Sequence, residues 1–212
     1  MMETMLKASY RAKLLEHGSP TMQAMNLRAA PGENIYLYGN SGRRQLHFTI
    51  LAGQRTPEDG TVSLNSHDFY SDPQLPAYRR DHVGILPNGG GLIPELTVLE
   101  QITLPMKLAQ WPREKILERL RTLTDPHFPS HDLYNRPKRC SLRKQAAASV
   151  LRMLAMEPEI LLIDGFLDDF EERDGDILWD LIEQHRRPDS ILIYLSGAPA
   201  PEQIHWTQTI RL

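Results

Sequence analysis

The chain has 212 residues, enough to bury a substantial core, and its 41% hydrophobic and 24% charged residues are typical of a globular protein, which excludes a disordered or fibrous chain. The formal net charge of −3 leaves no basic excess to neutralise a phosphate backbone, which argues against a nucleic-acid partner. Cys140 is the only cysteine, so an intrachain disulfide framework and a multi-cysteine metal site are both excluded.

The apolar runs have the length of strands and fall far short of the ~20 residues that a membrane-spanning helix needs. Residues 1–13 lack the apolar core of a secretion signal. We therefore expect a cytoplasmic protein whose contact with a membrane is at most peripheral.

The N-terminal residues 1–31 mix short apolar runs with Gly18, Pro20 and Pro31. This pattern predicts antiparallel strands that lead to a turn at 31–33. Tyr10 is open to two interpretations here: a half-buried strand tyrosine, or an aromatic ring that stacks on the adenine of a nucleotide.

The stretch from Tyr36 to Gly53 predicts a buried strand, a glycine turn and a helix. Nucleoside-triphosphate sites are built at such turns, with backbone amides around the phosphates and a lysine and a hydroxyl on the helix. When the pattern G-x-x-x-x-G-K-[ST] is placed on residues 39–46, Gly39 is retained. The second glycine becomes Arg44, the lysine becomes Gln45 and the hydroxyl becomes Leu46.

Arg43 and Arg44 place positive charge beside this turn. They are open to two interpretations: weak anion or nucleotide binding, or arginines that face solvent or an interface.

The segment 55–66 predicts a turn into an edge strand around Val62 and Leu64. A strand ending at Leu86 then runs into residues 87–91, which contain three consecutive glycines and predict either a flexible loop or a close backbone approach. Thr97, with Glu100 three residues later, predicts a capped helix start.

The C-terminal half predicts an exposed helix over 112–124, a helix from Ser141 to Met156, and buried strands at Ile160–Ile163 and 190–197. An acidic run follows the first of these strands. It predicts either a metal cluster or, in better agreement with the helix dipole, the charged start of the next helix. Its members are Asp168, Asp169, Glu171, Glu172, Asp174 and Asp176.

This order of elements resembles the ATP-binding subunit of an ABC transporter over nearly the whole chain, and most closely the small ATPases of lipid and lipoprotein transport. The resemblance implies an α/β fold: a P-loop NTPase-like ABC ATPase core with a mainly parallel sheet, an N-terminal antiparallel β region and a small helical subdomain. It implies a single domain over 1–212, with 88–145 as the inserted helical subdomain.

The resemblance also assigns residues to the family's sites. The nucleotide site would consist of Gly39, Ser41, Gly42, Arg43, Arg44, Gln45 and Tyr10. Asn88 matches the metal-coordinating glutamine, Asp164 matches the aspartate that holds magnesium, and Ser141 is what remains of the signature loop. The segment facing a membrane subunit would be Leu92, Ile93, Pro94, Leu96, Thr97, Val98 and Leu99.

The departures from the family pattern concern catalysis. Leu142 and Arg143 replace the signature glycines, Gly165 replaces the glutamate that polarises water, and Ser196 replaces a histidine. Since such sites act by positioning and charge stabilisation, we expect no hydrolysis.

The expected function is therefore that of a catalytically degenerate subunit with a structural or regulatory role, on the inner face of the cell membrane. Its expected partners are a permease and a second ATPase, in a homodimer or a heterodimer. No cofactor is required, although weak binding of ATP and Mg²⁺ stays open. The alternatives are an active ATPase with an atypical site, and a soluble nucleotide or anion sensor.

Overall fold

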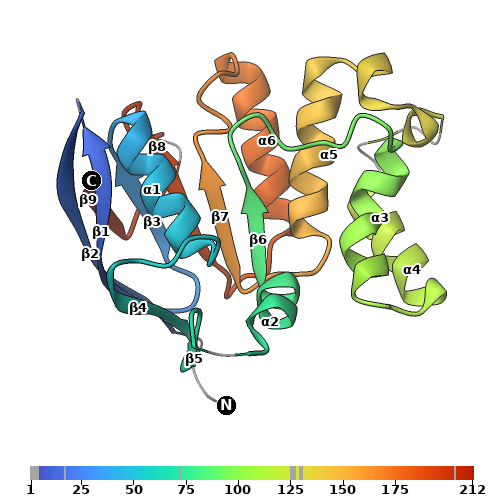
Figure 1. The fold of residues 1–212 in the computed structure, drawn as a ribbon. Coiled ribbons are helices and arrows are strands. Elements are labelled where there is room, and N and C mark those ends of the chain that lie inside the picture. The colour runs from blue at the N-terminus through green and yellow to red at the C-terminus, as the bar shows by residue number, and fades with distance from the viewer. Residues whose placement is uncertain (1–4, 17, 72, 125–127, 129–130, 203) are drawn as a thin grey trace.

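The computed structural model describes residues 5–16, 18–71, 73–124, 128, 131–202 and 204–212, which form two sheets flanked by helices (Figure 1). One sheet is antiparallel with strand order β2-β1-β4-β5, and the other is parallel with order β6-β7-β8-β3-β9. The α/β class, the parallel sheet and the N-terminal antiparallel region predicted from the sequence are confirmed.

The antiparallel strands are β1 (Leu6–Glu16), β2 (Ser19–Ala29), β4 (Asp59–Leu64) and β5 (His67–Asp68), and the parallel strands are β3 (Asn34–Tyr38), β6 (Val83–Leu86), β7 (Ile160–Asp164), β8 (Ile191–Ser196) and β9 (Gln208–Arg211). The α-helices are α1 (Ser41–Leu51), α2 (Leu75–His82), α3 (Val98–Leu108), α4 (Arg113–Thr124), α5 (Leu142–Leu154) and α6 (Glu172–His185), and two 3₁₀-helices are η1 (Asp132–Tyr134) and η2 (Pro137–Arg139).

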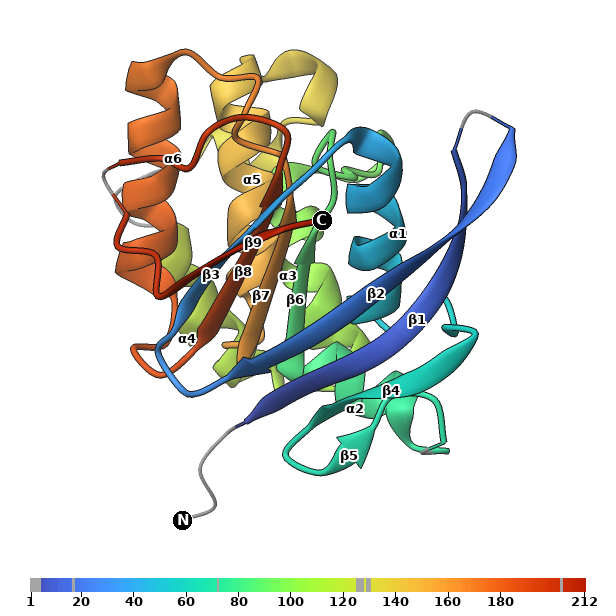
Figure 2. The ribbon, with the colours of Figure 1, turned by 90° about the vertical axis from the view of Figure 1, so that its left-hand side faces the viewer.

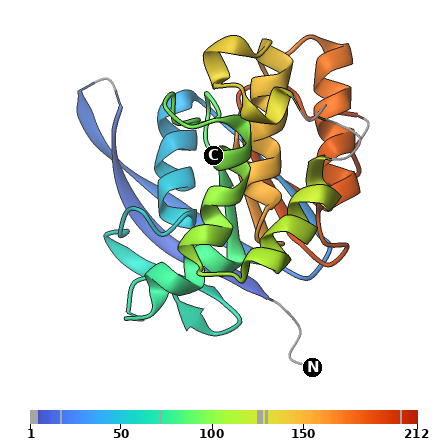
Figure 3. The same ribbon diagram turned by 90° about the vertical axis from the view of Figure 1, so that its right-hand side faces the viewer.

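The parallel sheet separates two hydrophobic cores. On one side, Ile35, Leu37 and the alternate residues of β7 and β8 pack with α1 and the antiparallel sheet. On the other side, Tyr36 and the intervening strand residues pack with α3, α5 and α6. Figures 1 and 3 show α3, α4, α5 and α6 grouped on the side of the sheet opposite α1. Because both faces are covered, the central strands β7 and β8 are almost entirely buried and apolar, without the alternation of a half-exposed sheet, whereas the edge strand β9 alternates.

Two strand assignments differ from the sequence prediction. The strand at Val62 and Leu64 is not an edge strand, because β4 lies between β1 and the two-residue β5. The short strand β9 was not predicted, and it pairs in parallel with β3 at the edge of the second sheet.

The β1–β2 hairpin is longer than its neighbours. Its strands pair from Leu6 with Ala29 to Glu16 with Ser19, whereas β4 pairs with β1 only as far as Arg11. The far half of the hairpin therefore extends beyond the rest of the antiparallel sheet, as Figure 2 shows.

No helix among the described residues combines the length and apolar character that crossing a bilayer requires.

A buried polar pair joins α1 to the antiparallel sheet. His47 of α1 and Tyr10 of β1 are 1% and 3% exposed, and the Tyr10 hydroxyl is hydrogen-bonded to His47 Nδ1 at 2.8 Å. Burial, with a smaller contribution from the charge of Arg43, lowers the pKa of His47 from 6.5 to about 4.

We predict that this histidine makes folding sensitive to mild acid. The unfolded chain protonates at pH 6.5 and the folded chain only at about pH 4, so stability is complete above 6.5 and declines as the pH falls through this window. The expected loss of unfolding free energy between about pH 7.5 and about pH 5 is about 2 kcal/mol. Urea denaturation at both pH values measures it.

The control is His47→Gln, which keeps a hydrogen-bonding group for Tyr10 and does not titrate. This variant is expected to lose about 2 kcal/mol less than the wild type between the two pH values. An equal loss in both proteins would contradict the assignment to His47.

Candidate functional site

The candidate site lies where the carboxyl ends of β3, β7 and β8 meet. These strands are parallel and adjacent in the order β7-β8-β3, so the loops that follow them emerge from one edge of the sheet. The amide of Gly39 donates to the carbonyl of Ser196 at 3.0 Å, and that of Gly165 donates to Leu195 at 2.7 Å. The predicted site residues that follow β3, β7 and β8 are far apart in the sequence and lie close together in the fold.

The turn before α1 is shaped as the sequence predicts, but its amides are partly used. Asn40 is the N-cap residue, and its Oδ1 accepts a hydrogen bond of 2.9 Å from the amide of Arg43. An anion at this helix start would compete with that side chain. A Cβ atom added at Gly39 would lie 2.8 Å from the Cβ of Leu212, so this position requires glycine.

Arg43 is engaged with the hairpin. Its Nε and Nη2 donate to the carboxylate of Glu16 at 2.7 and 3.1 Å, and its Nη1 donates to the carbonyl of Leu212 at 3.0 Å. The hydrogen bonds from Arg43 lower the pKa of Glu16 to about 2. This arginine therefore joins α1, the hairpin and the C-terminal strand.

Arg44 reaches across the strand ends. Its Nη1 lies 3.4 Å from Asp168 Oδ2, and the two side chains are 16% and 21% exposed. A Cβ atom at Gly165 would lie 3.0 Å from this nitrogen, and one at Gly197 would lie 3.4 Å from it. The guanidinium thus fills the space between the turn before α1 and the loops after β7 and β8.

Asp168, the ion-pair partner of Arg44, also accepts hydrogen bonds from two side chains of β8. Its Oδ1 accepts from the Tyr194 hydroxyl at 2.7 Å, and its Oδ2 accepts from the Ser196 hydroxyl at 2.6 Å. Ser196, at the position of the family's histidine, is therefore a partner of this carboxylate.

Asp164 lies beside the same cation. Its Oδ1 is buried and has no hydrogen-bond partner within the described part of the chain. Burial raises the pKa of Asp164, the positive charge of Arg44 lowers it, and the negative charge of Asp168 raises it. Arg44 accordingly provides positive charge next to two carboxylates.

The position of the expected magnesium hydroxyl carries an apolar residue. Magnesium requires oxygen ligands in a near-octahedral arrangement. Leu46, at the position of the expected hydroxyl, is 2% exposed and belongs to the core. Among the residues that the structure describes, no group of three or more His, Cys, Asp or Glu side chains is arranged to hold a metal ion.

The other predicted nucleotide-site residues are distributed over separate hollows. Gly39, Ser41, Arg43 and Arg44 line a cavity of about 450 Å³ together with Arg211. Gly42 and Gln45 line a neighbouring hollow of about 460 Å³. Tyr10 is buried against His47, so its ring offers no surface for stacking on a base, and this residue is removed from the candidate site.

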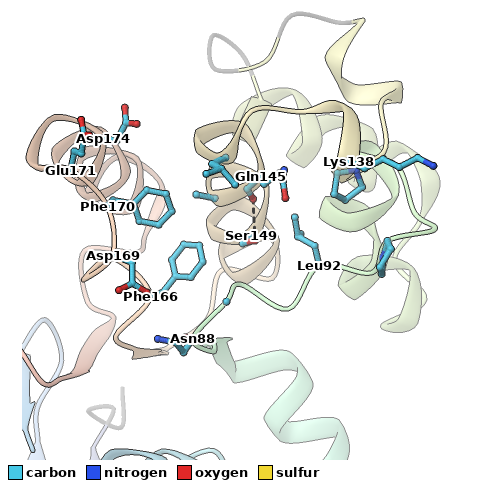
Figure 4. Close-up of a pocket in the computed structure, with 15 residues that line it drawn as sticks. Asn88, Leu92, Lys138, Gln145, Ser149, Phe166, Asp169, Phe170, Glu171 and Asp174 are labelled. Carbon is cyan, nitrogen blue, oxygen red and sulfur yellow. Dashed lines mark hydrogen bonds between the residues drawn. The ribbon is translucent and has the colours of Figure 1, made fainter. Parts of the chain in front are cut away.

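Asn88 opens into a different cavity. This space of about 840 Å³ lies between the glycine loop, the start of α5 and the segment after β7 (Figure 4). Its walls include Leu92, Gln145 and the rings of Phe166 and Phe170. Asp164, the other residue predicted for the metal, is not among the residues that line this cavity.

The residues of the expected signature begin α5. Ser141 is the N-cap, and its hydroxyl accepts from the amide of Lys144 at 3.4 Å. Leu142 follows with 77% of its surface exposed.

The glycine loop is held in a fixed shape. Gly89, Gly90 and Gly91 have φ values of 81°, 74° and 64°, a region that side chains disfavour. A Cβ atom at Gly90 would lie 2.6 Å from Ser149 Oγ. Arg152 donates to the carbonyls of Gly90 and Gly91, each at 2.6 Å. Of the two interpretations of the glycines, the close backbone approach is the one that the structure supports.

The predicted docking segment is exposed only in its first part. Ile93 and Pro94 are exposed, and Leu92, Leu96 and Leu99 are partly buried. Thr97 caps α3 in a capping box with Glu100, as predicted. Val98 is 1% exposed and packs in the core, so it offers no surface to a partner.

The second part of the acidic run, from Glu171 to Asp176, forms the N-cap and first turns of α6, as the helix interpretation predicted, whereas Asp168 and Asp169 precede the helix. Glu172 and Asp174 lie in the first helical turn, and Asp174 pairs with Arg143 at 3.4 Å. The pairing of Asp168 with Arg44 was not predicted. Its sequence signal was the combination of an arginine at the glycine position of the turn and a carboxylate four residues after Asp164.

Comparisons with known proteins agree with this fold. The family described as ABC transporter matches residues 22–167. The lipoprotein-releasing system ATP-binding protein LolD of Syntrophus aciditrophicus is 27% identical over 81% of this chain and 78% of its own length. LolD of Geobacter metallireducens is 26% identical over 90% and 86%. A solved ATP-binding cassette, dimeric in a post-hydrolysis state with ADP and Pi, has a TM-score of 0.78 at 21% identity and covers 91% of this chain and 88% of its own.

We predict that Arg44→Met destabilises the protein by about 1–3 kcal/mol, because two partly buried carboxylates lose their cation. The pKa of Asp164 is already above its ordinary value of 3.8 and rises further in the variant, so the deficit grows as the pH rises from that value. Chemical denaturation over a series of pH values measures this. A deficit independent of pH would contradict the electrostatic role.

We also predict that Gly90→Ala is more disruptive than Gly89→Ala. Both substitutions place a side chain at positive φ, at a cost of about 1–2 kcal/mol each. Only Gly90 has no room for a Cβ atom, whereas the same atom at Gly89 meets nothing within 4 Å. Thermal melting of the two variants makes the comparison, and equal melting temperatures would contradict the close approach at Gly90.

Proposed function

Because this chain belongs to the ABC transporter family, we propose that it is a catalytically degenerate ATP-binding subunit with a structural or regulatory role in a membrane transport complex. In this chain the family's catalytic groups are replaced, and the structural or regulatory role is the part of the family's function that does not need them.

The observation that carries the proposal is the position of Arg44. Its guanidinium lies against Gly165 and Gly197 and pairs with Asp168, beside the buried Asp164. Phosphoryl transfer depends on charges positioned around the transferred group. In this chain the cation of Arg44 is held at this edge of the sheet, and Gly165 is found where a general base is expected. Both features support a subunit that does not hydrolyse ATP.

Pairing with a second ATPase does not restore the missing groups. In the family, the phosphate loop of one chain faces the signature loop of another. This chain would bring Gln45 in place of the lysine, and Leu142 and Arg143 in place of the glycines. In a homodimer both sites would lack both halves, and in a heterodimer each site would lack one half.

We further propose that the chain docks on a permease through the inserted helical subdomain, residues 88–145. Within the segment predicted for docking, Ile93 and Pro94 are exposed, and Leu92 and Leu96 retain part of their surface. LolD relatives support a lipid or lipoprotein substrate. Such a complex would hold this chain against the inner face of the membrane.

A second candidate is supported by the cavity of about 450 Å³ lined by Arg43, Arg44 and Arg211. Three cations around one hollow favour weak binding of an anion or a nucleotide without turnover. Arg43 and Arg44 are already paired with Glu16 and Asp168, which weakens this candidate.

The test is calorimetric titration of ATP with magnesium, paired with phosphate release from the same sample. We expect no phosphate release above the level of an Asp164→Asn variant, and at most millimolar nucleotide affinity. A paired measurement with an added intact ATPase of the LolD type examines the heterodimer.

The Asp164→Asn variant is the matched control, because it removes the family's magnesium ligand with little change in shape. Release that persists in the variant belongs to a contaminant. Release by the wild type that disappears in the variant would overturn the proposal and favour an active ATPase with an atypical site. Binding without release would favour the nucleotide sensor.

A further inference from the structure

The outward face of the β1–β2 hairpin is basic. Alternation along the strands buries Leu6, Ala8 and Tyr10 and turns the intervening side chains outward. The outward cations are Lys7, Arg11 and Lys13 of β1 and Arg28 of β2. This concentration of positive charge contrasts with the net charge of −3 for the whole chain.

Two of these cations face each other directly. Lys7 is the cross-strand partner of Arg28 in the β1–β2 register. Like charges at directly opposite positions destabilise a sheet, so an isolated folded chain gains nothing from this pair. An anionic partner that covers the face would turn the same pair into a favourable interaction.

Carboxylates of the same sheet compensate little of this charge. Among the ion pairs of the described residues, the charged group of Arg11 is the only one of the four with a carboxylate within 4 Å, that of Asp59 at 3.9 Å, and these two side chains are 67% and 72% exposed. Glu58 also lies near the face, where its carboxylate accepts a hydrogen bond of 2.7 Å from the backbone amide of Lys13. Asp68 on the far strand β5 accepts hydrogen bonds from the amides of Tyr70 and Ser71 and from Thr61. An exposed pair such as Arg11–Asp59 contributes little.

The basic face ends at an apolar tip. Leu15 and Met22 are 74% and 52% exposed, in the half of the hairpin that extends beyond β4. Met22 is opposite Lys13, and Leu15 is opposite Pro20. Figure 2 shows the end of the hairpin extending beyond β4.

We propose that the outer face of the β1–β2 hairpin binds the surface of an anionic lipid bilayer. Lys7, Arg11, Lys13 and Arg28 contact the headgroup phosphates, and Leu15 and Met22 enter the boundary between headgroups and acyl chains. Basic residues next to exposed apolar side chains are the combination that holds proteins on anionic membranes.

A single-stranded nucleic acid would use the same cations but would leave the apolar tip in water. Such partners also require aromatic platforms for base stacking. The outward positions of β1 and β2 carry Ser9, Ala24 and Asn26 between the cations, and no aromatic residue. The observations therefore favour the bilayer.

The experiment is co-sedimentation of the purified full chain with vesicles of phosphatidylcholine and phosphatidylglycerol, compared with vesicles of phosphatidylcholine alone. The wild type is expected to bind the anionic vesicles more tightly, and less tightly as salt is added. Lys7→Gln with Arg28→Gln is expected to lower the partition coefficient about fivefold per charge, roughly 25-fold in total. The matched control removes two exposed cations that lie outside the hairpin, on α4 and α6, by Arg121→Gln with Arg173→Gln.

A second variant tests the tip without changing charge. Leu15→Ser with Met22→Ser is expected to weaken binding to anionic vesicles at high salt, where the electrostatic attraction is screened. Thermal melting checks that each variant folds, and removal of the Lys7–Arg28 repulsion should leave the melting temperature unchanged or raised.

Three outcomes would overturn the proposal. The first is equal binding of the wild type to neutral and anionic vesicles. The second is equal loss of binding in the hairpin variant and the helix control, which would mean that only net charge matters. The third is tighter binding to a single-stranded oligonucleotide that depends on the same cations and not on the tip.

Discussion

The guanidinium of Arg44 is placed where three loops meet, and the local arrangement depends on its charge. It faces Asp168, which is itself held by Tyr194 and Ser196, and it lowers the pKa that burial gives to Asp164. Burial and the negative charge of Asp168 both raise the pKa of Asp164 and so favour its protonated form. The guanidinium of Arg44 thus supplies the positive charge that the carboxylates of Asp164 and Asp168 require at this edge of the sheet.

The fold tolerates this replacement because its stability resides elsewhere. The two cores are formed by alternate residues of the same parallel strands, packed on α1 and the antiparallel sheet on one side and on α3, α5 and α6 on the other. None of the family's catalytic positions belongs to those cores except Leu46, which adds apolar contact where a hydroxyl would be expected. The architecture and the chemistry of the edge are therefore separable.

Local patterns in the sequence were sufficient for most of the fold. A capped helix start is predicted by Thr97 with Glu100, a second helix by Ser141, and a buried strand by the apolar run at 160–163. Each of these patterns involves residues only a few positions apart. The candidate site was less predictable. Arg44 and Asp168 are 124 residues apart, so their pairing depends on the strand order and not on any local pattern. The burial of Tyr10 and Val98 was likewise decided by packing between distant elements.

Arg152 has a mechanical consequence. Its guanidinium joins α5 to the carbonyls of Gly90 and Gly91, and the same loop directly follows β6. Gly90 is also pressed against Ser149 of that helix, so the loop has no slack with which to absorb a displacement. A displacement of α5 is therefore passed through this loop to β6, the edge strand of the parallel sheet.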